Sequence, residues 1–291
     1  MTTTAGRGAA TPGQYRVVGT RAARHDGLDK VTGRARFGAD INLPGMLHGK
    51  ILRSPHAHAR IRSIDTSRAE ALPGVMAVAT AKDFPIIQQE EIVFSEAFRN
   101  PRLAAEIMLA HERVMYVGHA VAAVAATSPH IAEEAAKLIQ VDYEVLPAVL
   151  TIQDAMKEGA PILHENLTTR FRADRSGSGE DTGVKSNIAS HMQIKRGDVE
   201  QGFREATVIV EREFSTQTVH QGYIEPHAGV VALDRDGRVQ VWVSAKNPFG
   251  IRSQLAKATG VAEKTIRINV VNVGGEFGGK GDAFDMPVAY F

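Results

Sequence analysis

A glycine-rich run near the C-terminal end constrains this chain more than any other feature of its sequence. Residues 271–280 read VNVGGEFGGK, so four glycines surround Glu276 and Phe277. Glycine tolerates positive φ and lets the backbone approach a ligand closely, with its N–H groups directed at it. Residues 265–271 have the pattern of a β-strand, so we predict a ligand loop carried on a rigid strand. Only eleven residues follow Lys280, and we therefore expect another polypeptide, or sequence missing here, to complete the pocket.

Composition is that of a globular protein and excludes several kinds of site. The 291 residues are 43% hydrophobic and 23% charged, with a formal net charge of +1, so we expect neither nucleic acid nor a membrane as a partner. The absence of cysteine excludes disulfides, a cysteine nucleophile and cysteine-ligated iron–sulfur clusters in this chain. The N-terminal residues lack the apolar core of a secretory signal, and no long apolar run occurs, so we expect a cytoplasmic protein.

The patterning divides the chain into four segments. Residues 1–14 are small and polar and are predicted to form a disordered tail. Residues 15–166 are dense in short strands and turns, with two helices, and form the first predicted domain. A polar, glycine-containing stretch at 167–191 is the predicted linker, and residues 192–291 form the second domain.

Local signals predict several elements of the first domain. Residues 120–126 are an apolar run typical of a strand, and Ser128 followed by Pro129 is an N-cap with proline at the first helical position. Residues 141–145 return to strand pattern, which predicts a strand–helix–strand unit. Residues 102–114 are a second helix candidate.

The second domain is predicted to begin with sheet. Residues 208–214 are predicted to form a half-buried strand. Its two faces would hold Val208, Val210, Arg212 and Phe214 on one side and Ile209, Glu211 and Glu213 on the other. Residues 234–237 read DRDG between two apolar runs and predict a hairpin. Asn247 and Pro248 are expected to cap a helix that ends at Gly260.

The glycine run has two interpretations that need no family. Residues 274–280 fit G-x-x-x-x-G-K, a phosphate-binding pattern, but Gly281 stands where a nucleotide triphosphatase has Ser or Thr to bind magnesium. Glu276 would also repel phosphates. The other interpretation is a glycine-rich β-bulge without a ligand.

Two groups of histidines are weaker candidates. His56 and His58 would share one face of a strand, a geometry that can bind a metal, but no third ligand is evident, and packing is the commoner role. Glu225 lies close in sequence to His220 and His227, so an acid–base pair is one option. The favoured option for Glu225 is a structural carboxylate that accepts hydrogen bonds from turn amides.

An ordered series of runs resembles the molybdenum hydroxylases, the xanthine dehydrogenase and aldehyde oxidase family. Residues 274–280 are similar to the GGGFGGK run of that family, and the resemblance covers roughly residues 15 to 290. The other similar runs, in chain order, are residues 31–40, 47–59, 72–75, 117–124, 141–147, 161–164, 197–199, 221–228 and 244–248.

The resemblance implies the N-terminal portion of a large subunit with an α+β fold. A hammerhead α/β domain would be followed by the first part of a mixed α/β domain that binds a molybdenum–pyranopterin cofactor, either Mo-molybdopterin or its cytosine dinucleotide. This cofactor would be shared with missing sequence or with a partner. The matching residues implied to contact it are Gly274, Gly275, Phe277, Gly278 and Gly279, with Lys246 as a further candidate.

The resemblance also implies an activity and partners. Family members oxidise aldehydes, N-heteroaromatics or related substrates with oxygen derived from water, and pass the electrons to iron–sulfur and flavin groups. A chain without cysteine would take these groups from other subunits. The implied partners are the remaining half of the large subunit and an iron–sulfur subunit, with a flavin subunit as a further candidate.

Three positions depart from the family pattern. Lys246 replaces a glutamine near an oxygen ligand of molybdenum, and Glu276 replaces the middle glycine of the triple. Gly281 replaces a substrate-orienting glutamate, so a purine substrate is not supported. The general-base glutamate of the family lies far downstream and has no counterpart here. We therefore expect no catalytic and no metal-ligating residue in this chain, and no turnover by it alone. The alternative is a cofactor-free truncated relic or scaffold subunit with the hammerhead fold.

Overall fold

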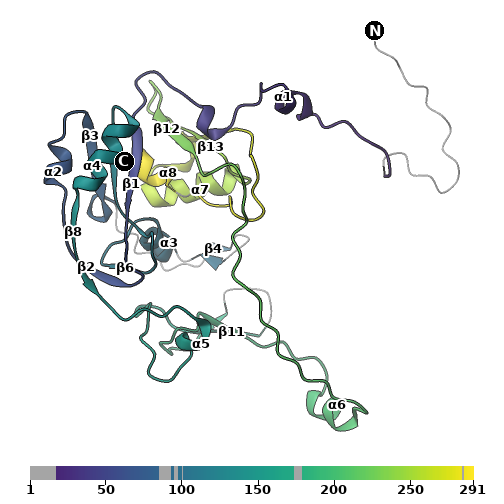
Figure 1. Cartoon of the computed structure of the whole chain (residues 1–291). Coiled ribbons are helices and arrows are strands. Elements are labelled where there is room, and N and C mark those ends of the chain that lie inside the picture. The colour runs from purple at the N-terminus through teal and green to yellow at the C-terminus, as the bar shows by residue number, and fades with distance from the viewer. Residues whose placement is uncertain (1–17, 85–92, 95–97, 100, 174–178, 284) are drawn as a thin grey trace, which may run out of the picture.

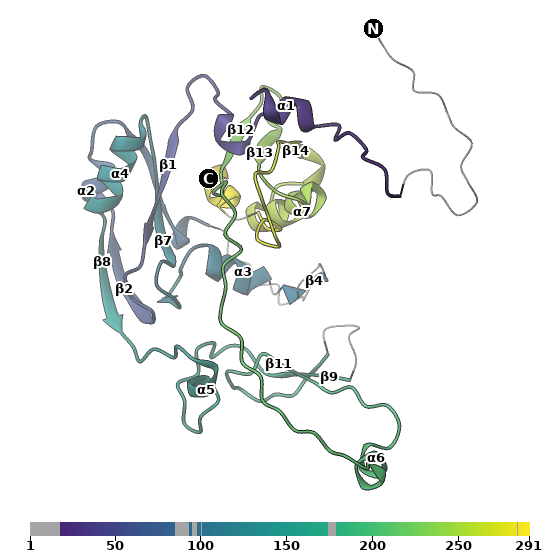
Figure 2. The same cartoon turned by 45° about the vertical axis from the view of Figure 1, so that its right-hand side comes forward.

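The computed structural model describes residues 18–84, 93, 94, 98, 99, 101–173, 179–283 and 285–291. The predicted tail lies outside these residues. Two packed lobes lie next to each other, and a long extended region projects away from both (Figures 1 and 2). No helix in the described ranges is long and apolar enough to cross a lipid bilayer.

The first lobe consists of two three-stranded antiparallel sheets and the helices packed on them (Figure 1). The first sheet has the order β1, β7, β3, and the second has the order β6, β2, β8. Their strands are β1 (His48–Arg53), β2 (Ala59–Asp65), β3 (Val75–Thr80), β6 (Arg113–Val114), β7 (Ala120–Ala126) and β8 (Gln140–Val145). The helices are α2 (Ser67–Glu70), α3 (Pro101–Met108) and α4 (Pro129–Leu138).

The central strand and its helix follow the sequence closely. The predicted strand at 120–126 is β7, and Ser128 Oγ accepts a hydrogen bond from the Ile131 N–H at 3.3 Å at the start of α4. Small side chains let the helix approach the sheet, because Ala132 and Ala135 of α4 are fully buried above β7. The strand–helix–strand order is confirmed, but β7 and β8 belong to different sheets.

The second predicted helix of this lobe is shorter than expected. α3 ends at Met108, and the Ala110 N–H donates to the Ala120 carbonyl at 2.8 Å instead of continuing the helix. Residues 113 and 114 then pair with β2 as β6. The apolar residues of 102–114 are therefore divided between a helix and a short strand, and Leu109, Ala110 and Val114 are buried after the helix has ended.

In the sequence between the two lobes, the predicted linker forms a small sheet. β9 (Arg170–Arg172) pairs antiparallel with β10 (Glu180–Asp181) and parallel with β11 (Ser190–Met192). Asn187 anchors the region, since its Nδ2 donates to the carbonyls of Ala155 and Pro161. These side-chain hydrogen bonds hold the region in place. The polar and aperiodic sequence does not predict them. The predicted domain bounds remain a prediction.

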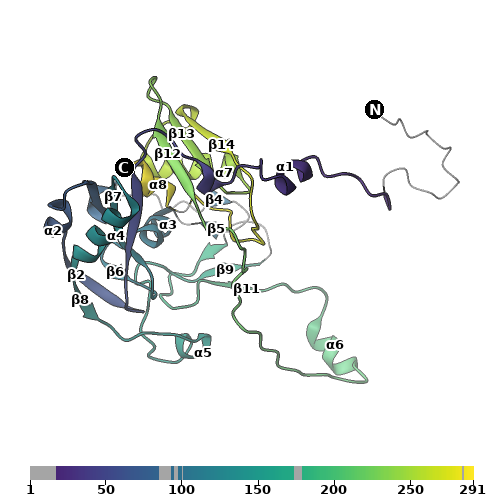
Figure 3. The ribbon, with the colours of Figure 1, turned by 45° about the horizontal axis from the view of Figure 1, so that its top comes forward.

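Beyond this small sheet the chain forms an exposed arm, which we define as residues 193–222. Every residue of the arm is exposed, and α6 (Val199–Glu205) lies near its tip, away from both lobes in all three views (Figures 1, 2 and 3). The predicted half-buried strand at 208–214 is wrong for this structure, because the segment is extended but neither paired nor buried. The sequence has the side-chain pattern of a strand here, but none of the sheets formed by the described residues includes this segment.

The second lobe is a mixed three-stranded sheet covered by two helices. β12 (Gly229–Leu233) and β13 (Val239–Val243) form the predicted hairpin, and β14 (Ile266–Val270) lies parallel to β13. α7 (Pro248–Thr259) and α8 (Met286–Tyr290) pack beside the sheet. Asn247 Oδ1 accepts from the Gly250 N–H at 3.0 Å, and Gly260 ends α7 at φ +74°, as predicted.

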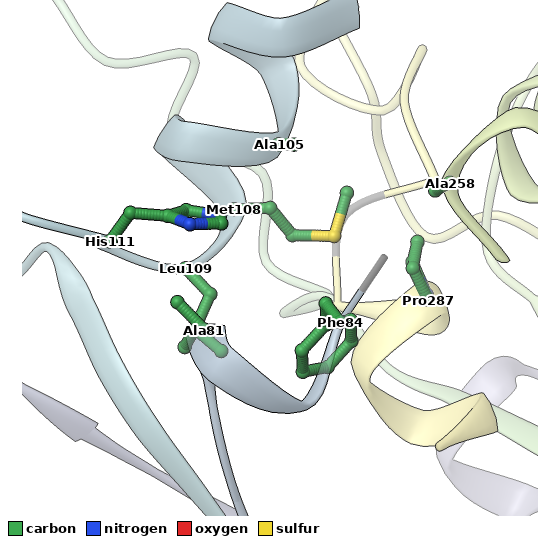
Figure 4. Close-up of a pocket in the computed structure, with 8 residues that line it drawn as sticks. All are labelled: Ala81, Phe84, Ala105, Met108, Leu109, His111, Ala258 and Pro287. Carbon is green, nitrogen blue, oxygen red and sulfur yellow. The ribbon is translucent and has the colours of Figure 1, made fainter. Parts of the chain in front are cut away.

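The two lobes are joined by hydrogen bonds and by apolar contacts. The segment before β1 is attached to the second lobe, since the Asn272 N–H donates to the Arg36 carbonyl at 2.9 Å. Between the lobes, the Phe84 and Phe291 rings meet edge to face. A small apolar pocket lies between the lobes (Figure 4). Its lining residues are Ala81, Phe84, Ala105, Met108, Leu109, His111, Ala258 and Pro287. The remaining short elements are α1 (Gly27–Val31), η1 (Gly38–Asp40), η2 (Ala81–Asp83), β4 (Val93–Phe94), β5 (Phe98–Arg99), α5 (Ile152–Ala155) and η3 (Glu263–Thr265).

Candidate functional site

The site is formed where two parallel strands end. Since β13 and β14 run in the same direction, the segments that follow them leave the sheet at the same edge. Lys246 follows β13, and the glycine loop, residues 271–281, follows β14. The Lys246 N–H donates to the Lys280 carbonyl at 3.1 Å. The structure therefore brings Lys246 to the glycine loop, as the site prediction requires.

The loop turns through a series of left-handed residues. Gly275 has φ +107° and Gly278 has φ +94°. Between them Phe277 has φ +49°, and it is the one non-glycine with positive φ among the residues that the structure describes. This conformation is uncommon for a bulky residue and is maintained only where the surroundings impose it. The Phe277 side chain is 73% exposed, so the tight turn presents an aromatic ring outward.

The underside of the loop is packed against residues 221–225. A Cβ atom on Gly274 would lie 2.7 Å from Glu225 Cβ, and one on Gly279 would lie 2.6 Å from Tyr223 Cε1. These two glycines are needed for close packing within the protein. Gly278 differs, because a Cβ built there meets nothing within 4 Å. The open side of the loop is therefore at Phe277 and Gly278.

A buried ion pair holds the loop on this support. Glu225 Oε2 accepts from the Gly274 N–H at 2.7 Å and from Lys280 Nζ at 2.5 Å. The Lys280 side chain is fully buried, and its ammonium lies 4.9 Å from the centre of the Tyr223 ring. The favoured role of Glu225, a structural carboxylate that binds a turn amide, is confirmed. Sequence reasoning missed that Lys280 pairs with Glu225 and lies against Tyr223, because these residues are far apart in the sequence.

The same ion pair argues against nucleotide binding. A phosphate-binding loop of the G-x-x-x-x-G-K type extends its lysine toward the ligand phosphates. Here the Lys280 ammonium points into the protein, where Glu225 neutralises it. His227 Nε2 lies 2.6 Å from the Tyr223 hydroxyl oxygen, and an acid–base role for Glu225 with a histidine stays a prediction.

The two charged departures from the family pattern contact each other. Lys246 Nζ lies 3.2 Å from Glu276 Oε1. Hydrogen bonding from the Gly278 backbone, and then from the Lys246 side chain and the Lys280 backbone, holds the pKa of Glu276 below its usual value, although desolvation opposes this. The carboxylate that sequence reasoning expected to oppose an anionic cofactor is thus compensated within the loop.

These residues fit an anionic group that lies beside an apolar surface. The Lys246 ammonium, paired with Glu276, adds positive charge at this edge, Gly278 leaves open space, and Phe277 supplies an aromatic face. None of these groups is a strong metal ligand. A metal centre here would therefore bring its own ligands, as an organic metal cofactor does.

The histidine pair of the first lobe has a structural environment. His56 and His58 lie between β1 and β2 and not on a strand. His58 is buried, with Nδ1 2.8 Å from the Pro147 carbonyl oxygen, and the His56 ring meets Tyr143 edge to face. No group of three or more His, Cys, Asp or Glu able to hold a metal occurs within the described part of the chain.

Two family sequence models match separate parts of the chain. Residues 32–147 match the a/b hammerhead domain of aldehyde oxidase and xanthine dehydrogenase. Residues 181–291 match the molybdopterin cofactor-binding domain. The first match covers the two-sheet lobe, and the second contains the arm, the β12–β13–β14 sheet and the glycine loop.

Curated relatives align along nearly the whole chain. A probable xanthine dehydrogenase subunit of Bacillus subtilis is 35% identical over 91% of this chain and 32% of its own length. The nicotinate dehydrogenase large molybdopterin subunit of Eubacterium barkeri is 32% identical over 92% of this chain and 56% of its own length. The chain therefore spans about a third of the first relative and just over half of the second.

Solved structures agree with these alignments. Quinoline 2-oxidoreductase from Pseudomonas putida 86 superposes with a TM-score of 0.70 at 31% identity, over 90% of this chain and 31% of that one. Reconstituted CO dehydrogenase from Oligotropha carboxidovorans gives a TM-score of 0.75 at 32% identity, over 90% and 32% of the two chains.

Proposed function

Because this chain belongs to the xanthine dehydrogenase and aldehyde oxidase family and spans part of its molybdenum-binding large subunit, we propose that its glycine loop forms one wall of a molybdenum–pyranopterin site. The family matches confirm the predicted fold, a hammerhead domain followed by a molybdopterin-binding domain. The observation that carries the proposal is the tight turn that exposes Phe277 and Gly278 beside Lys246.

The proposed roles of the loop residues follow from their surroundings. Gly278 provides close backbone approach, Phe277 the apolar wall for the substrate, and Lys246 a hydrogen-bond donor to the cofactor. Gly274, Gly275 and Gly279 keep the turn seated on residues 221–225. When bound, the cofactor would supply the redox chemistry, in which a substrate C–H becomes C–OH with oxygen from water and two protons and two electrons are released.

The proposed substrate class is an aldehyde or a nitrogen heteroaromatic. Two relatives are named for nicotinate and quinoline, which both contain a pyridine ring. An outward phenyl ring at Phe277 suits a flat apolar substrate, since aromatic rings pack favourably in offset or edge-to-face contacts. Gly281 offers no side chain to orient a purine.

The proposed working form is a cytoplasmic complex. The other part of the large subunit would contribute the general base, which these residues lack, and an iron–sulfur subunit, with or without a flavin subunit, would accept the electrons. Relatives named as subunits and large chains support this assembly. The chain by itself is then inactive.

Molybdenum content and a matched pair of variants test this function. The complex is purified from its own host with wild-type chain, Phe277→Ala or Phe249→Ala. Phe249 lies in α7 and is 72% exposed, which makes it a control for loss of an exposed ring. We expect about one molybdenum per chain in all three, and turnover reduced about tenfold or more only in Phe277→Ala, the size of a lost hydrophobic substrate contact. Equal turnover in the two variants would remove Phe277 from the site.

The scaffold alternative is favoured by one observation. The Glu276 carboxylate lies 3.2 Å from the Lys246 ammonium, and the Gly278 backbone is the largest cause that lowers its pKa, so Lys246 already pairs with a carboxylate of the protein. An assembled complex that contains this chain but no molybdenum would support the scaffold and contradict the cofactor site.

A further inference from the structure

The three positions that depart from the family pattern meet at one side chain. Lys246 Nζ lies 3.2 Å from Glu276 Oε1, and a Cβ atom on Gly281 would lie 3.6 Å from Lys246 Cε. Lys246 is also attached to the loop through its backbone, since its N–H donates to the Lys280 carbonyl. The end of the Lys246 side chain therefore lies beside both Glu276 and Gly281, and the three departures form one local arrangement.

The lack of a side chain at Gly281 leaves space next to the end of the lysine. Among the described residues outside 280–282, the Cε of Lys246 is the one heavy atom within 4 Å of the Cβ position at 281. The Lys246 side chain is 36% exposed, whereas that of Glu276 is 23% exposed. A longer side chain at 281 would approach the ammonium, so glycine at this position keeps the ammonium accessible.

The ammonium lies at the same turn as the exposed aromatic ring. Its partner Glu276 directly precedes Phe277, whose side chain is 73% exposed. The ion pair and the ring are therefore presented by neighbouring residues of one loop. A flat substrate that packs on Phe277 would be able to reach the ammonium with an atom at the edge of its own ring.

The charge balance decides which substrate atom the lysine suits. An ammonium donates hydrogen bonds and accepts none. Because the Glu276 carboxylate lies 3.2 Å from it, the pair carries no net charge, and a substrate carboxylate would be repelled by Glu276 as well as attracted by Lys246. A neutral acceptor, such as the lone pair of a pyridine-type ring nitrogen, gains the donor without this repulsion.

We propose that Lys246 is a specificity-determining residue that donates a hydrogen bond to the ring nitrogen of a neutral heteroaromatic substrate, and that Glu276 is a positioning residue that holds its ammonium. The inference rests on the proposed function, because the substrate is the one that packs on Phe277. An ammonium has three N–H groups, so contacts with Glu276, with the cofactor and with the substrate are compatible. Gly281 gives the substrate ring room to approach.

Matched aldehydes and variants test this role in the complex purified from its own host. The probes are benzaldehyde and the three pyridinecarbaldehydes, which differ from it by one ring nitrogen. The measured quantity is kcat/KM for the best pyridine aldehyde divided by kcat/KM for benzaldehyde, a ratio that cancels changes in cofactor content. The variants are Lys246→Met, Glu276→Gln and Gly281→Glu. Lys137→Met is the control, since it removes an exposed lysine that is also ion-paired with a glutamate.

The variants should differ in this ratio. We expect it to fall about tenfold in Lys246→Met, the size of one hydrogen bond to a charged group, through a higher KM for the pyridine aldehyde. It should fall by less in Glu276→Gln, which leaves the ammonium without its carboxylate, and also in Gly281→Glu, whose new carboxylate would pair with the ammonium. The control should keep the wild-type ratio, and a purely structural effect would change both aldehydes alike. A wild-type ratio in Lys246→Met would overturn the specificity role, and one in Glu276→Gln would overturn the positioning role.

Calorimetry decides the question where a variant fails to assemble. It uses the wild-type complex without an electron acceptor, and compares benzyl alcohol with the three pyridylmethanols. Binding about tenfold tighter for the best pyridine compound would support the proposal. Equal binding of the pyridine and benzene compounds would overturn it.

Other outcomes separate this inference from the proposed function. A molybdenum-loaded complex with a wild-type ratio in Lys246→Met would leave the cofactor site intact and overturn the inference. A complex without molybdenum would contradict the proposed function, and the inference with it. A preference for the anionic formylbenzoates over the neutral aldehydes, lost in Lys246→Met, would make Lys246 a carboxylate-binding residue and overturn the neutral acceptor.

Discussion

The central strand of the first lobe and the arm segment show what a strand pattern does and does not determine. β7 (Ala120–Ala126) lies between β1 and β3, pairs with both, and is almost wholly buried. Residues 208–214 were also predicted to be a strand but are exposed along their whole length. The difference is whether neighbouring strands are available, because β1 and β3 lie in the same lobe as β7 and pair with it. A pattern therefore predicts that a segment can be a strand, and the rest of the polypeptide decides whether it becomes one.

Limited proteolysis of the isolated chain should show the largest difference between these regions. Arg212 in the arm and Arg60 in β2 both have exposed side chains, but only Arg60 lies in a hydrogen-bonded strand. We expect trypsin to cut after Arg212 at least about a thousandfold faster, since cleavage of a paired strand requires the lobe to unfold. Mass spectrometry of the fragments over time measures both rates. Similar rates would mean that the two segments do not differ in local stability.

Removing the buried lysine of the glycine loop should have the next largest effect. Lys280→Met leaves the Glu225 carboxylate in a buried place without its cation, and breaking such a pair costs about 3–5 kcal/mol. The matched control in the first lobe is Lys137→Met, which removes an exposed lysine of α4. Urea denaturation should show a large loss for the first variant and about 0.5 kcal/mol or less for the second, whose exposed ion pair with Glu133 contributes little. A small loss for Lys280→Met would show that the ion pair does not hold the loop.

The sequence was informative where the signals were local. The cap at Ser128, the hairpin at 234–237 and the end of α7 at Gly260 all occur where predicted, because each depends on a few adjacent residues. The ion pairs of the loop were not predictable, since Lys280 and Glu225 are 55 positions apart in sequence. The positions of Phe277 and Gly278 as the open side of the loop also emerge only when residues 221–225 are seen beneath the others. How these residues act on a cofactor remains a prediction.

Acidification should destabilise the first lobe through a buried histidine. The Met115 N–H donates to His119 Nδ1 at 3.1 Å, and His119 Nε2 lies 2.8 Å from the Glu106 carbonyl, so the imidazole is held neutral. Burial lowers the pKa of His119 below its usual 6.5. Below pH 6.5 the unfolded chain therefore binds a proton that the folded chain does not, and stability falls as the pH decreases toward the folded pKa.

Calorimetry between pH 7.5 and 5.5 measures this effect. We expect the thermal midpoint to fall by a few degrees in the wild type and by less in His119→Asn, whose side-chain oxygen can still accept from Met115 but does not titrate. Burial also lowers the pKa of His164 and of His227, so the variant should retain part of the dependence. The same pH dependence in variant and wild type would exclude His119 as a contributor.

The smallest predicted effect distinguishes two carboxylates that are each paired with a lysine. In α4 the Lys137 side chain is the largest cause that lowers the pKa of Glu133, whereas at the loop the Gly278 backbone is the largest cause for Glu276 and Lys246 comes after it. Carboxyl titration by NMR should therefore show Glu133 returning most of the way to its ordinary pKa in Lys137→Gln. Glu276 should stay well below its ordinary value in Lys246→Gln. A full return of Glu276 would mean that Lys246, and not the loop backbone, holds the carboxylate, and that a glutamine at this position would release it.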